Sequence, residues 1–424
     1  MEAYAAVLAY AIPGFLLLIL AESLVARWRG VVVNRAADTI SSLSSGITNT
    51  LWTLLGLAVV ILSYEWMVAH WALFHLTNRP WVYALAFIGL DFKGYWSHRW
   101  NHKVNLFWNR HVIHHSSEEY NLSCALRQSV SAIVGIYFFL YIPMALLGIP
   151  TEVVAVVAPI HFFSQFWYHT RLIDKMGFLE YIIVTPSHHR VHHAINDEYL
   201  DKNFAEIFII WDKLFGTFQA ELPDVVPVYG TKRPAKTWNP LLINFMHVWS
   251  IIQDAWHTRS WWDKLRIWFM PTGWRPADVA VRFPIPYYQH ASQQQKYDSH
   301  PSRALQYWSW GQLVVTMVLL YYLMFHLGDL RFGQILGFGS FLLLSIFAFT
   351  TLLDRHRLAL VAEGGKLVFG LALSYQFGGW FGIDQLWSYG TGLVVVYLLV
   401  SFVGTAFFTW KEGLATTATG QLLA

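Results

Sequence analysis

The stretch TPSHHRVHHAIND (Thr185–Asp197) carries four histidines within six positions. His189, His192 and His193 form an H-x-x-H-H box, and residues three and four positions apart share one face of a helix. Burying several imidazoles without partners is costly, because each ring brings polar nitrogens out of water. A metal ion offsets this cost, since imidazole is a ligand for Fe, Zn, Cu and Ni. The box therefore predicts a metal site built on a helix.

Two groups upstream repeat this pattern. SHRWNHKVNLFWNRHVIHH (Ser97–His115) contains an H-x-x-x-H pair followed by another H-x-x-H-H box, and a further histidine stands near the end of a later apolar run. Nine imidazoles suit two metal ions with four or five nitrogens each. The predicted ligands are His98, His102, His111, His114, His115, His169, His189, His192 and His193.

Three arguments favour iron at this site. A structural zinc needs only four ligands and a catalytic zinc about three. The hydrolytic H-E-x-x-H arrangement is absent, because the first pair reads H-R-W-N-H (98–102) without a glutamate between the histidines. Two redox-active ions beside a membrane suit the activation of O2 against an inert C–H bond. We therefore expect two Fe ions and O2-dependent chemistry.

Other side chains are candidates for supporting roles. His161 and His188 are either ligands or groups that orient a ligand, and the second interpretation is favoured. Asp91, Glu118 and Glu119 either accept hydrogen bonds from ligand N–H groups or are charges at helix ends. The same supporting set includes Gln165 and Asn121. The following aromatic residues either wall a substrate channel or pack in the core or against lipid: Tyr95, Trp96, Phe138, Phe166 and Trp167.

The composition points to a membrane protein. Of the 424 residues, 55% are hydrophobic and only 13% are charged, whereas an ordinary soluble chain carries about 25% charge. The net charge of +3 is too small to suggest nucleic acid as a partner. The single cysteine, Cys124, excludes an internal disulfide and a thiolate metal cluster. Any metal is therefore bound by nitrogen and oxygen.

Nine apolar runs approach the roughly 20 residues that a membrane helix needs. They cover residues 4–24, 45–68, 81–97, 130–148, 152–168, 306–326, 332–352, 358–380 and 387–409. The first run lacks the basic start and cleavage site of a signal peptide, so we expect a retained helix. The sequence thus predicts an all-α polytopic membrane protein. Arg27, Arg29 and Arg35 follow the first helix, which predicts that this end, with the histidine groups, is cytoplasmic.

Composition also divides the chain. We expect N-terminal membrane helices in 1–80, a histidine-bearing domain in 81–270, a Pro-rich linker in 271–305 and a C-terminal four-helix membrane unit in 306–424. Within the second domain, residues 239–270 mix aromatic and basic side chains. That mixture is typical of an interfacial helix lying on lipid headgroups, and it fits a helix packed on the catalytic domain equally well.

The order of the three histidine groups resembles the fatty acid hydroxylase/sterol desaturase superfamily of membrane di-iron enzymes. Three sequence segments are similar to the alkylglycerol monooxygenase family: HHSSEEYNLSCALRQS (114–129), QFWYHT (165–170) and DKNFAEIFIIWDKLFGTF (201–218). The resemblance implies hydroxylation of a lipid C–H bond, at the carbon next to the ether oxygen of an alkylglycerol, which yields an aldehyde and a glycerol derivative. Two alternatives stay open. One is a hydroxylase or desaturase of a sterol, fatty acyl, carotenoid or aminolipid substrate, and the other is a metal- or haem-binding membrane protein.

The resemblance also implies cofactors and partners. It alone suggests a reduced pterin, tetrahydrobiopterin, as the reductant. Because no cytochrome b5-like domain is recognisable, we expect a separate electron donor, together with a lipid substrate from the bilayer. The oligomeric state is left open. One position departs from the family, since Lys103 stands where the family carries glutamate after the first histidine pair. Either Glu118 or Glu119 replaces that carboxylate, or the substrate or reductant differs.

Overall fold

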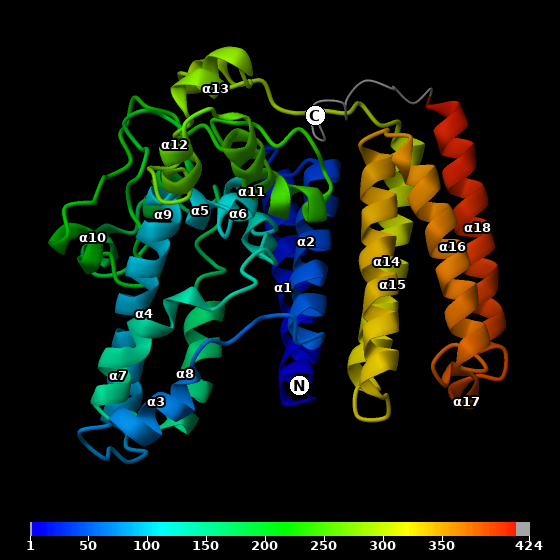
Figure 1. The fold of residues 1–424 in the computed structure, drawn as a ribbon, viewed down its shortest axis with the longest axis horizontal. Helices are drawn as coiled ribbons and strands as arrows, with labels where there is room; N and C mark the ends of the chain where they lie inside the picture. The colour runs from blue at the N-terminus through cyan, green and yellow to red at the C-terminus, as the bar shows by residue number, and fades with distance from the viewer. Residues whose placement is uncertain (1, 413–424) are drawn as a thin grey trace.

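The computed structural model describes residues 2–412, and every regular element in that range is a helix. Three isolated β-bridges join loops, and the described residues form no strand. Figure 1 shows the helices standing side by side, with α4 and α8 at one edge, α1 and α2 in the middle, and α14 to α18 at the other edge. The predicted all-α fold is confirmed.

Five helices in the described part of the chain are long and apolar enough to cross a membrane. They are α1 (Glu2–Trp28), α14 (Arg303–Phe325), α15 (Phe332–Leu353), α16 (Leu358–Gln376) and α18 (Gly390–Lys411). The last four form the predicted C-terminal unit, together with the short α17 (Ile383–Leu386). Protein covers less than half of α1, α16 and α18, so their apolar side chains require lipid. The chain is an integral membrane protein.

The other four predicted spans, 45–68, 81–97, 130–148 and 152–168, do not form helices that are both long and apolar enough to cross a membrane. The first is interrupted, because α2 (Ala36–Leu54) ends before a turn at Gly56, where φ is +62°, a conformation that glycine adopts without strain. The helix that follows, α3 (Tyr64–Trp71), has only eight residues.

The hairpin predicted over 130–168 is also too short to span. It consists of a 3-10 helix η2 (Ile136–Tyr141), the five-residue α7 (Ile142–Leu146) and the 13-residue α8 (Thr151–Phe163). A spanning helix needs about 20 residues. Apolar composition alone did not reveal where these helices break.

Helix α4 (Pro80–Lys103) has sufficient length, with 24 residues, but its second half is too polar. That half carries Asp91, Lys93 and the first histidine pair. The apolar residues of α4 pack instead in a buried cluster with α7 and α8: Val82, Ala86, Leu90, Met144, Val153 and Val157. One face of its apolar run is therefore covered by protein, whereas Trp81 and Ile88 on the same run stay exposed.

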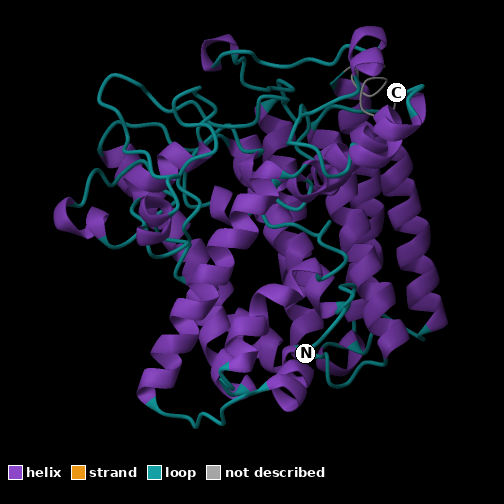
Figure 2. Cartoon of the chain, turned by 60° about the vertical axis from the view of Figure 1, so that its left-hand side comes forward, coloured by secondary structure: helices purple, strands orange, loops and turns teal. Residues whose placement is uncertain are grey.

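Short elements and long loops gather at one end of the molecule, away from the N-terminus (Figure 2). The short elements are α5 (Asn105–Trp108), α6 (Val112–His115), η1 (Cys124–Leu126), η3 (Gly177–Tyr181), α9 (Pro186–His193) and α10 (Ile210–Leu214). Figure 1 shows α5, α6 and α9 near the carboxyl end of α4. This arrangement brings all the histidine groups together.

Residues 239–270 form two helices, α11 (Pro240–His257) and α12 (Trp261–Arg266). Helix α11 packs against α2 and α6, whereas Trp256, Trp261 and Trp262 are exposed. The segment therefore packs on the histidine-bearing domain and also presents an aromatic surface. Its contact with lipid headgroups stays a prediction.

The Pro-rich segment 271–305 contains α13 (Ala277–Arg282) and η4 (Ala291–Gln293). It also ties the C-terminal unit to the histidine-bearing domain. Asp354, in the loop after α15, accepts hydrogen bonds from the backbone N–H of Trp238 at 2.7 Å and from the hydroxyl of Tyr297 at 3.0 Å. The backbone N–H of Tyr297 also donates to Glu118 at 2.5 Å. Glu118 lies three residues after a predicted ligand, so the C-terminal unit braces the loop beside the site.

Candidate metal centre

The structure brings the nine predicted ligands into two neighbouring groups. Within each group, one ring nitrogen from each histidine lies within 4.8 Å of the corresponding nitrogens of the others. The first group consists of His98, His102, His111, His115 and His192. The second group consists of His114, His169, His189 and His193. The rings of His115 and His193 stack at 4.3 Å between centroids and join the two groups.

Each group draws on several elements. Helix α4 contributes His98 and His102, one turn apart on the face that points toward α9. Helix α6 begins after His111, and its two histidines are adjacent in sequence, so one ring falls in each group. Helix α9 begins with a proline at its first turn, which the missing N–H favours. Its last turn presents ligands to both groups.

In the second group, the Nε2 atoms form a continuous series. The separations are 3.1 Å between His193 and His189, 3.0 Å between His189 and His169, and 3.3 Å between His169 and His114. Nitrogens bound at ~2.1 Å to one ion lie about 3.0 to 3.4 Å apart, in octahedral or tetrahedral geometry. The spacing therefore fits four ligands of a single metal ion.

In the first group, Nε2 of His98 and Nε2 of His111 lie 2.8 Å apart. The Nε2 atoms of His102, His115 and His192 are buried and have no hydrogen-bond partner among the described residues. Leaving a buried polar atom unpaired costs about 1–3 kcal/mol. A cation bound among these nitrogens would remove that cost, so this group also fits a metal ion.

Backbone carbonyl groups fix the orientation of several rings. Four ligands place Nδ1 at 2.7 to 3.3 Å from a carbonyl oxygen: His98 at Phe204, His114 at Arg127, His169 at Gln165 and His192 at Lys202. A carbonyl only accepts, so Nδ1 carries the proton and Nε2 presents its lone pair to the centre. The tautomer required of a metal ligand is thus set by the fold.

The nine imidazoles are neutral at neutral pH. Burial lowers the pKa of each one, because the charged form is poorly solvated. Neighbouring imidazoles lower the pKa further in every case except His102, where Lys103 does so. For His114 the pKa falls to about 4. Neutral imidazoles in this number are suited to ligation, since only the neutral ring has a free lone pair.

A buried ion pair that sequence reasoning missed supports the second group. Arg127 is 1% exposed, and its Nη2 lies 2.8 Å from Oδ1 of Asp38 on α2. The same guanidinium donates to Ser116 at 2.7 Å, and the carbonyl of Arg127 receives the His114 contact described above. The sequence feature that could have indicated this pair is DTISSLSS (38–45), a polar run in an otherwise strongly apolar chain.

Asp91, His161 and Gln165 form a separate polar group between α4 and α8. His161 Nε2 lies 2.9 Å from Asp91, whose oxygens also accept from two backbone N–H groups and one indole of the 207–211 segment. Gln165 donates to Glu206 at 3.2 Å. Ring and carboxylate atoms of Asp91, His161 and Glu206 lie within 4.8 Å of one another. Because Asp91 already has four donors, we interpret this group as a hydrogen-bonded support.

Four other candidates face away from the nine rings. Glu118 accepts from the Tyr297 backbone, and Glu119 pairs with Lys296 at 2.6 Å and with two arginines. Asn121 accepts from Ser123 and the next backbone N–H, as in a turn. His188 lies outside both groups, with its ring against Phe218. These residues order the surrounding loops.

The carboxylate nearest the first pair is Asp201, which sequence reasoning did not single out. Its Oδ1 lies 3.7 Å from Nδ1 of His102, and its Oδ2 lies 2.6 Å from Nζ of Lys103. The suggestion that Glu118 or Glu119 supplies this carboxylate is therefore wrong. Glu118 and Glu119 lie close in sequence to a predicted ligand, but both side chains point toward the 271–305 segment.

The five aromatic candidates for a channel are packed with other aromatic residues. Tyr95 and Trp96 contact Phe215, and Phe166 lies 4.4 Å from Phe15 of α1 between ring centroids. The two others sit beside their chain neighbours: Phe138 and Trp167. None lines the cavity described next, so a channel along them stays a prediction.

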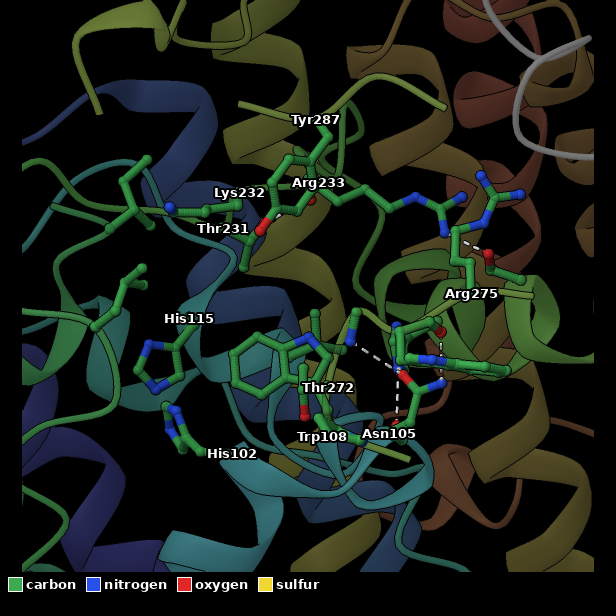
Figure 3. Close-up of a pocket in the computed structure, with 18 of the residues that line it drawn as sticks. His102, Asn105, Trp108, His115, Thr231, Lys232, Arg233, Thr272, Arg275 and Tyr287 are labelled. Carbon is green, nitrogen blue, oxygen red and sulfur yellow. Dashed lines mark hydrogen bonds between the residues drawn. The ribbon is translucent and has the colours of Figure 1, made fainter. Parts of the chain in front are cut away.

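A cavity of about 580 Å³ lies against the first group (Figure 3). His102, His115, His192 and His193 form part of its wall. The indole of Trp108 also lines it and lies 5.0 Å from the ring of His102. Further parts of the wall come from Lys103, from residues 194–201 and 230–233, from α11 and from the 271–305 segment. This cavity gives a ligand access to the metal centre.

Comparison with known proteins agrees with this geometry. The family model for fatty acid hydroxylase matches residues 83–217, which include all nine histidines. Alkylglycerol monooxygenase of Homo sapiens is 36% identical over 371 residues, covering 87% of this chain and 82% of that protein. The Danio rerio alkylglycerol monooxygenase is 42% identical over 243 residues, covering 56% and 53%.

A more distant relative is the ornithine lipid hydroxylase OlsE of Rhizobium tropici, which is 29% identical over 135 residues, or 32% of this chain and 40% of that protein. No solved structure matches the chain. The long match to the human protein extends well beyond the histidine-bearing region and into the membrane helices. The chain belongs to the alkylglycerol monooxygenase family of oxidoreductases.

Proposed function

We propose that this protein is a membrane-bound di-iron monooxygenase that hydroxylates the carbon next to the ether oxygen of an alkylglycerol lipid. The observation that carries the proposal is the convergence of nine neutral imidazoles as a group of five and a group of four. Family membership supports the choice of lipid, and the fit of both groups to a metal ion supports the cofactor.

With two iron ions bound, the centre would reduce O2 with two electrons and two protons. One oxygen atom would become water, and the other would be inserted into the C–H bond. The resulting carbon carries both a hydroxyl and the ether oxygen. Such a hemiacetal breaks its C–O bond to glycerol, and the hydroxyl proton passes to the glycerol oxygen. The products are a fatty aldehyde and a glycerol derivative.

Residues of this chain would hold the metal ions and shield them from water. The two groups would hold the ions through Nε2, because the backbone carbonyls keep Nδ1 protonated in His98, His169 and His192. Tyr120 and Tyr168 pack against the second group and help to exclude water. Asp201 places a negative charge beside His102 and thereby increases the basicity of that ring.

We assign the metal centre to the cytoplasmic side. Arg35 follows α1, Arg355 follows α15 and Lys411 ends α18, and Figure 1 places these three helix ends toward the end of the molecule that carries α9. Basic residues concentrate at the cytoplasmic ends of membrane helices. The reductant is then a soluble molecule of the cytoplasm, and a reduced pterin is the candidate that the family suggests.

Metal analysis followed by a product assay tests this function. We expect about two Fe per chain in iron-replete protein purified in detergent. With O2, reduced tetrahydrobiopterin and an alkylglycerol, the iron-loaded protein should release a fatty aldehyde. Two irons with no aldehyde, and hydroxylation of another lipid instead, would assign a different substrate in the same family. Zinc in place of iron, or no metal, would show that the histidine groups are misinterpreted.

A further inference from the structure

The cavity beside the first histidine group carries an excess of positive charge. Its wall includes four cationic side chains but only two carboxylates. The cations are Lys103, Lys232, Arg233 and Arg275, and the carboxylates are Asp201 and Asp254. This excess of cationic side chains favours an anionic ligand over a neutral or cationic one.

Three of these cations have a carboxylate partner. The ion pairs are Lys103 with Asp201 at 2.6 Å, Lys232 with Asp197 at 2.7 Å, and Arg275 with Asp254 at 2.6 Å. Arg275 engages both oxygens of Asp254, because a second hydrogen bond of 2.7 Å joins them. The charge on these three side chains is therefore already balanced within the protein.

Arg233 is the exception. Its guanidinium donates to the neutral hydroxyl of Ser250, and no carboxylate oxygen in the described residues lies within 4.0 Å of it. Burial and repulsion by Arg275 lower the pKa of Arg233, which means that its charge is poorly stabilised by its surroundings. Figure 3 shows the side chain of Arg233 extending along the cavity toward Arg275 and away from His102 and His115.

The wall also offers an unused polar group. The Oγ1 atom of Thr272 is buried and has no hydrogen-bond partner among the described residues. Thr272 lines the same cavity as Arg233 and Lys232. A hydroxyl and a guanidinium together suit the several acceptor oxygens of an oxyanion, since hydrogen bonds between charged groups are the strong ones. The unpaired charge of Arg233 and the unpaired hydroxyl of Thr272 therefore both favour the binding of an anion in this cavity.

We infer that this cavity binds an oxyanion through Arg233. On the basis of the proposed function, we identify this anion as the phosphate of an ether-lipid headgroup. In such a lipid only the three-carbon glycerol separates the phosphate from the ether oxygen. The metal centre forms one part of the wall and Arg233 another, so a glycerol phosphate would span the cavity while the alkyl chain extends toward the bilayer. The preferred substrate class is then a phosphate-bearing alkylglycerol.

A binding measurement tests the site without turnover. Thermal unfolding of the detergent-solubilised protein is followed with sn-glycerol 3-phosphate, inorganic phosphate or glycerol at constant ionic strength. We expect stabilisation by glycerol 3-phosphate and none by glycerol. Arg233→Met should abolish it, and Arg233→Lys, which keeps the charge, should retain part. Arg259→Met is the matched control, because Arg259 is exposed and outside the cavity.

Each other outcome of the binding measurement decides the assignment. Equal stabilisation by inorganic phosphate would keep the oxyanion site and overturn the headgroup assignment. Stabilisation that survives Arg233→Met, or that is lost equally in Arg259→Met, would overturn the site. If Arg233→Met does not fold, the comparison of Arg233→Lys with the wild type decides: unchanged glycerol 3-phosphate affinity in Arg233→Lys also overturns the site.

Turnover separates this inference from the proposed function. In Arg233→Met we expect KM for a phosphate-bearing alkylglycerol to rise about 10- to 100-fold, as for the loss of a charge-assisted hydrogen bond. The KM for a neutral alkylglycerol should stay within about two-fold, because no charge contact is lost. Cleavage of both lipids with unchanged KM in Arg233→Met overturns the phosphate site alone. Binding of glycerol 3-phosphate without cleavage of either lipid overturns the proposed function alone.

Discussion

The two histidine groups differ in how a ligand reaches them. Three of the five imidazoles in the first group line the cavity, and their Nε2 atoms are unpaired. In the second group only His193 lines the cavity, and the rings of Tyr120 and Tyr168 cover the other side. A metal that does chemistry keeps an accessible position, whereas a closed set of ligands serves structure. We therefore expect the first position to meet substrate and the second to hold its ion more tightly.

The largest effect should come from removing one ligand of each group. Helix α9 offers a matched pair, since His188 and His189 are adjacent and both buried, but only His189 belongs to a group. We expect His189→Ala to lose the second ion and all measurable activity, because a metal site that loses a ligand loses affinity. His192→Ala should do the same to the first ion, and metal analysis with an activity assay measures both.

His188→Ala is the control and should keep both ions. If it loses as much metal as His189→Ala, the effect belongs to the folding of α9 and the ligand assignment fails. If His189→Ala keeps two ions, the second group is not a metal site.

The next effect is on stability and concerns the support of the second group. Arg127→Met would leave the carboxylate of Asp38 buried without its partner. Breaking one side of a buried ion pair costs about 3–5 kcal/mol. We expect a marked fall in the thermal midpoint, with unchanged metal content in the fraction that folds, because the Arg127 carbonyl still accepts from His114.

The double variant Arg127→Met with Asp38→Leu separates charge from packing. It removes both charges, so it should recover much of the stability lost in the single variant. A double variant less stable than Arg127→Met would show that packing, and not the unpaired charge, dominates this site.

The ligands were predictable from sequence because their information is local. An H-x-x-H-H box occupies one turn of helix, so its spacing alone places the rings on one face, as at His189, His192 and His193. The assignment of rings to two groups was not predictable. His114 and His115 are neighbours in the chain and belong to different groups, which only the packing of α4, α6 and α9 decides.

The errors share a cause, since they concern groups distant in sequence. Lys103 and Asp201 are 98 residues apart, and Arg127 and Asp38 are 89 apart. Composition marked 271–305 as a linker, yet Thr272 and Arg275 of this segment line the cavity. Apolar content likewise could not tell the buried surface of α4 from a lipid-facing one, because both are apolar.

A smaller effect sharpens the comparison at the first group. Asp201→Asn removes the negative charge beside His102 while keeping the shape of the side chain. We expect the affinity of the first ion to fall about 10- to 100-fold, as is usual when a group that supports a ligand is lost. The second ion should be unaffected, and competition with a chelator resolves the two. Asp197→Asn is the control, because Asp197 pairs with Lys232 away from the nine histidines. Equal weakening of both ions would contradict the separate support of the first position.

The smallest effect tests a carboxyl that belongs to neither group. Burial raises the pKa of Glu118 to about 7 from its ordinary value of 4.5. The fold therefore favours the protonated form, so this stabilisation is complete below about pH 4.5 and disappears as pH rises through about 7. Glu118→Gln should flatten the fall of the thermal midpoint between pH 5 and pH 8, by roughly 1–3 kcal/mol of unfolding free energy at the upper end. In Glu118→Gln, the remaining pH dependence of the thermal midpoint should come in part from Asp354, whose pKa is also raised to about 7.

Metal content decides whether Glu118 is independent of the two groups. Because the side chain of Glu118 faces the backbone of Tyr297, we expect both ions to be retained in Glu118→Gln at every pH in that range. Loss of the first ion alone would show that the brace from the 271–305 segment holds the cavity side of the metal centre. That result would make the open position, but not the closed one, depend on the C-terminal unit.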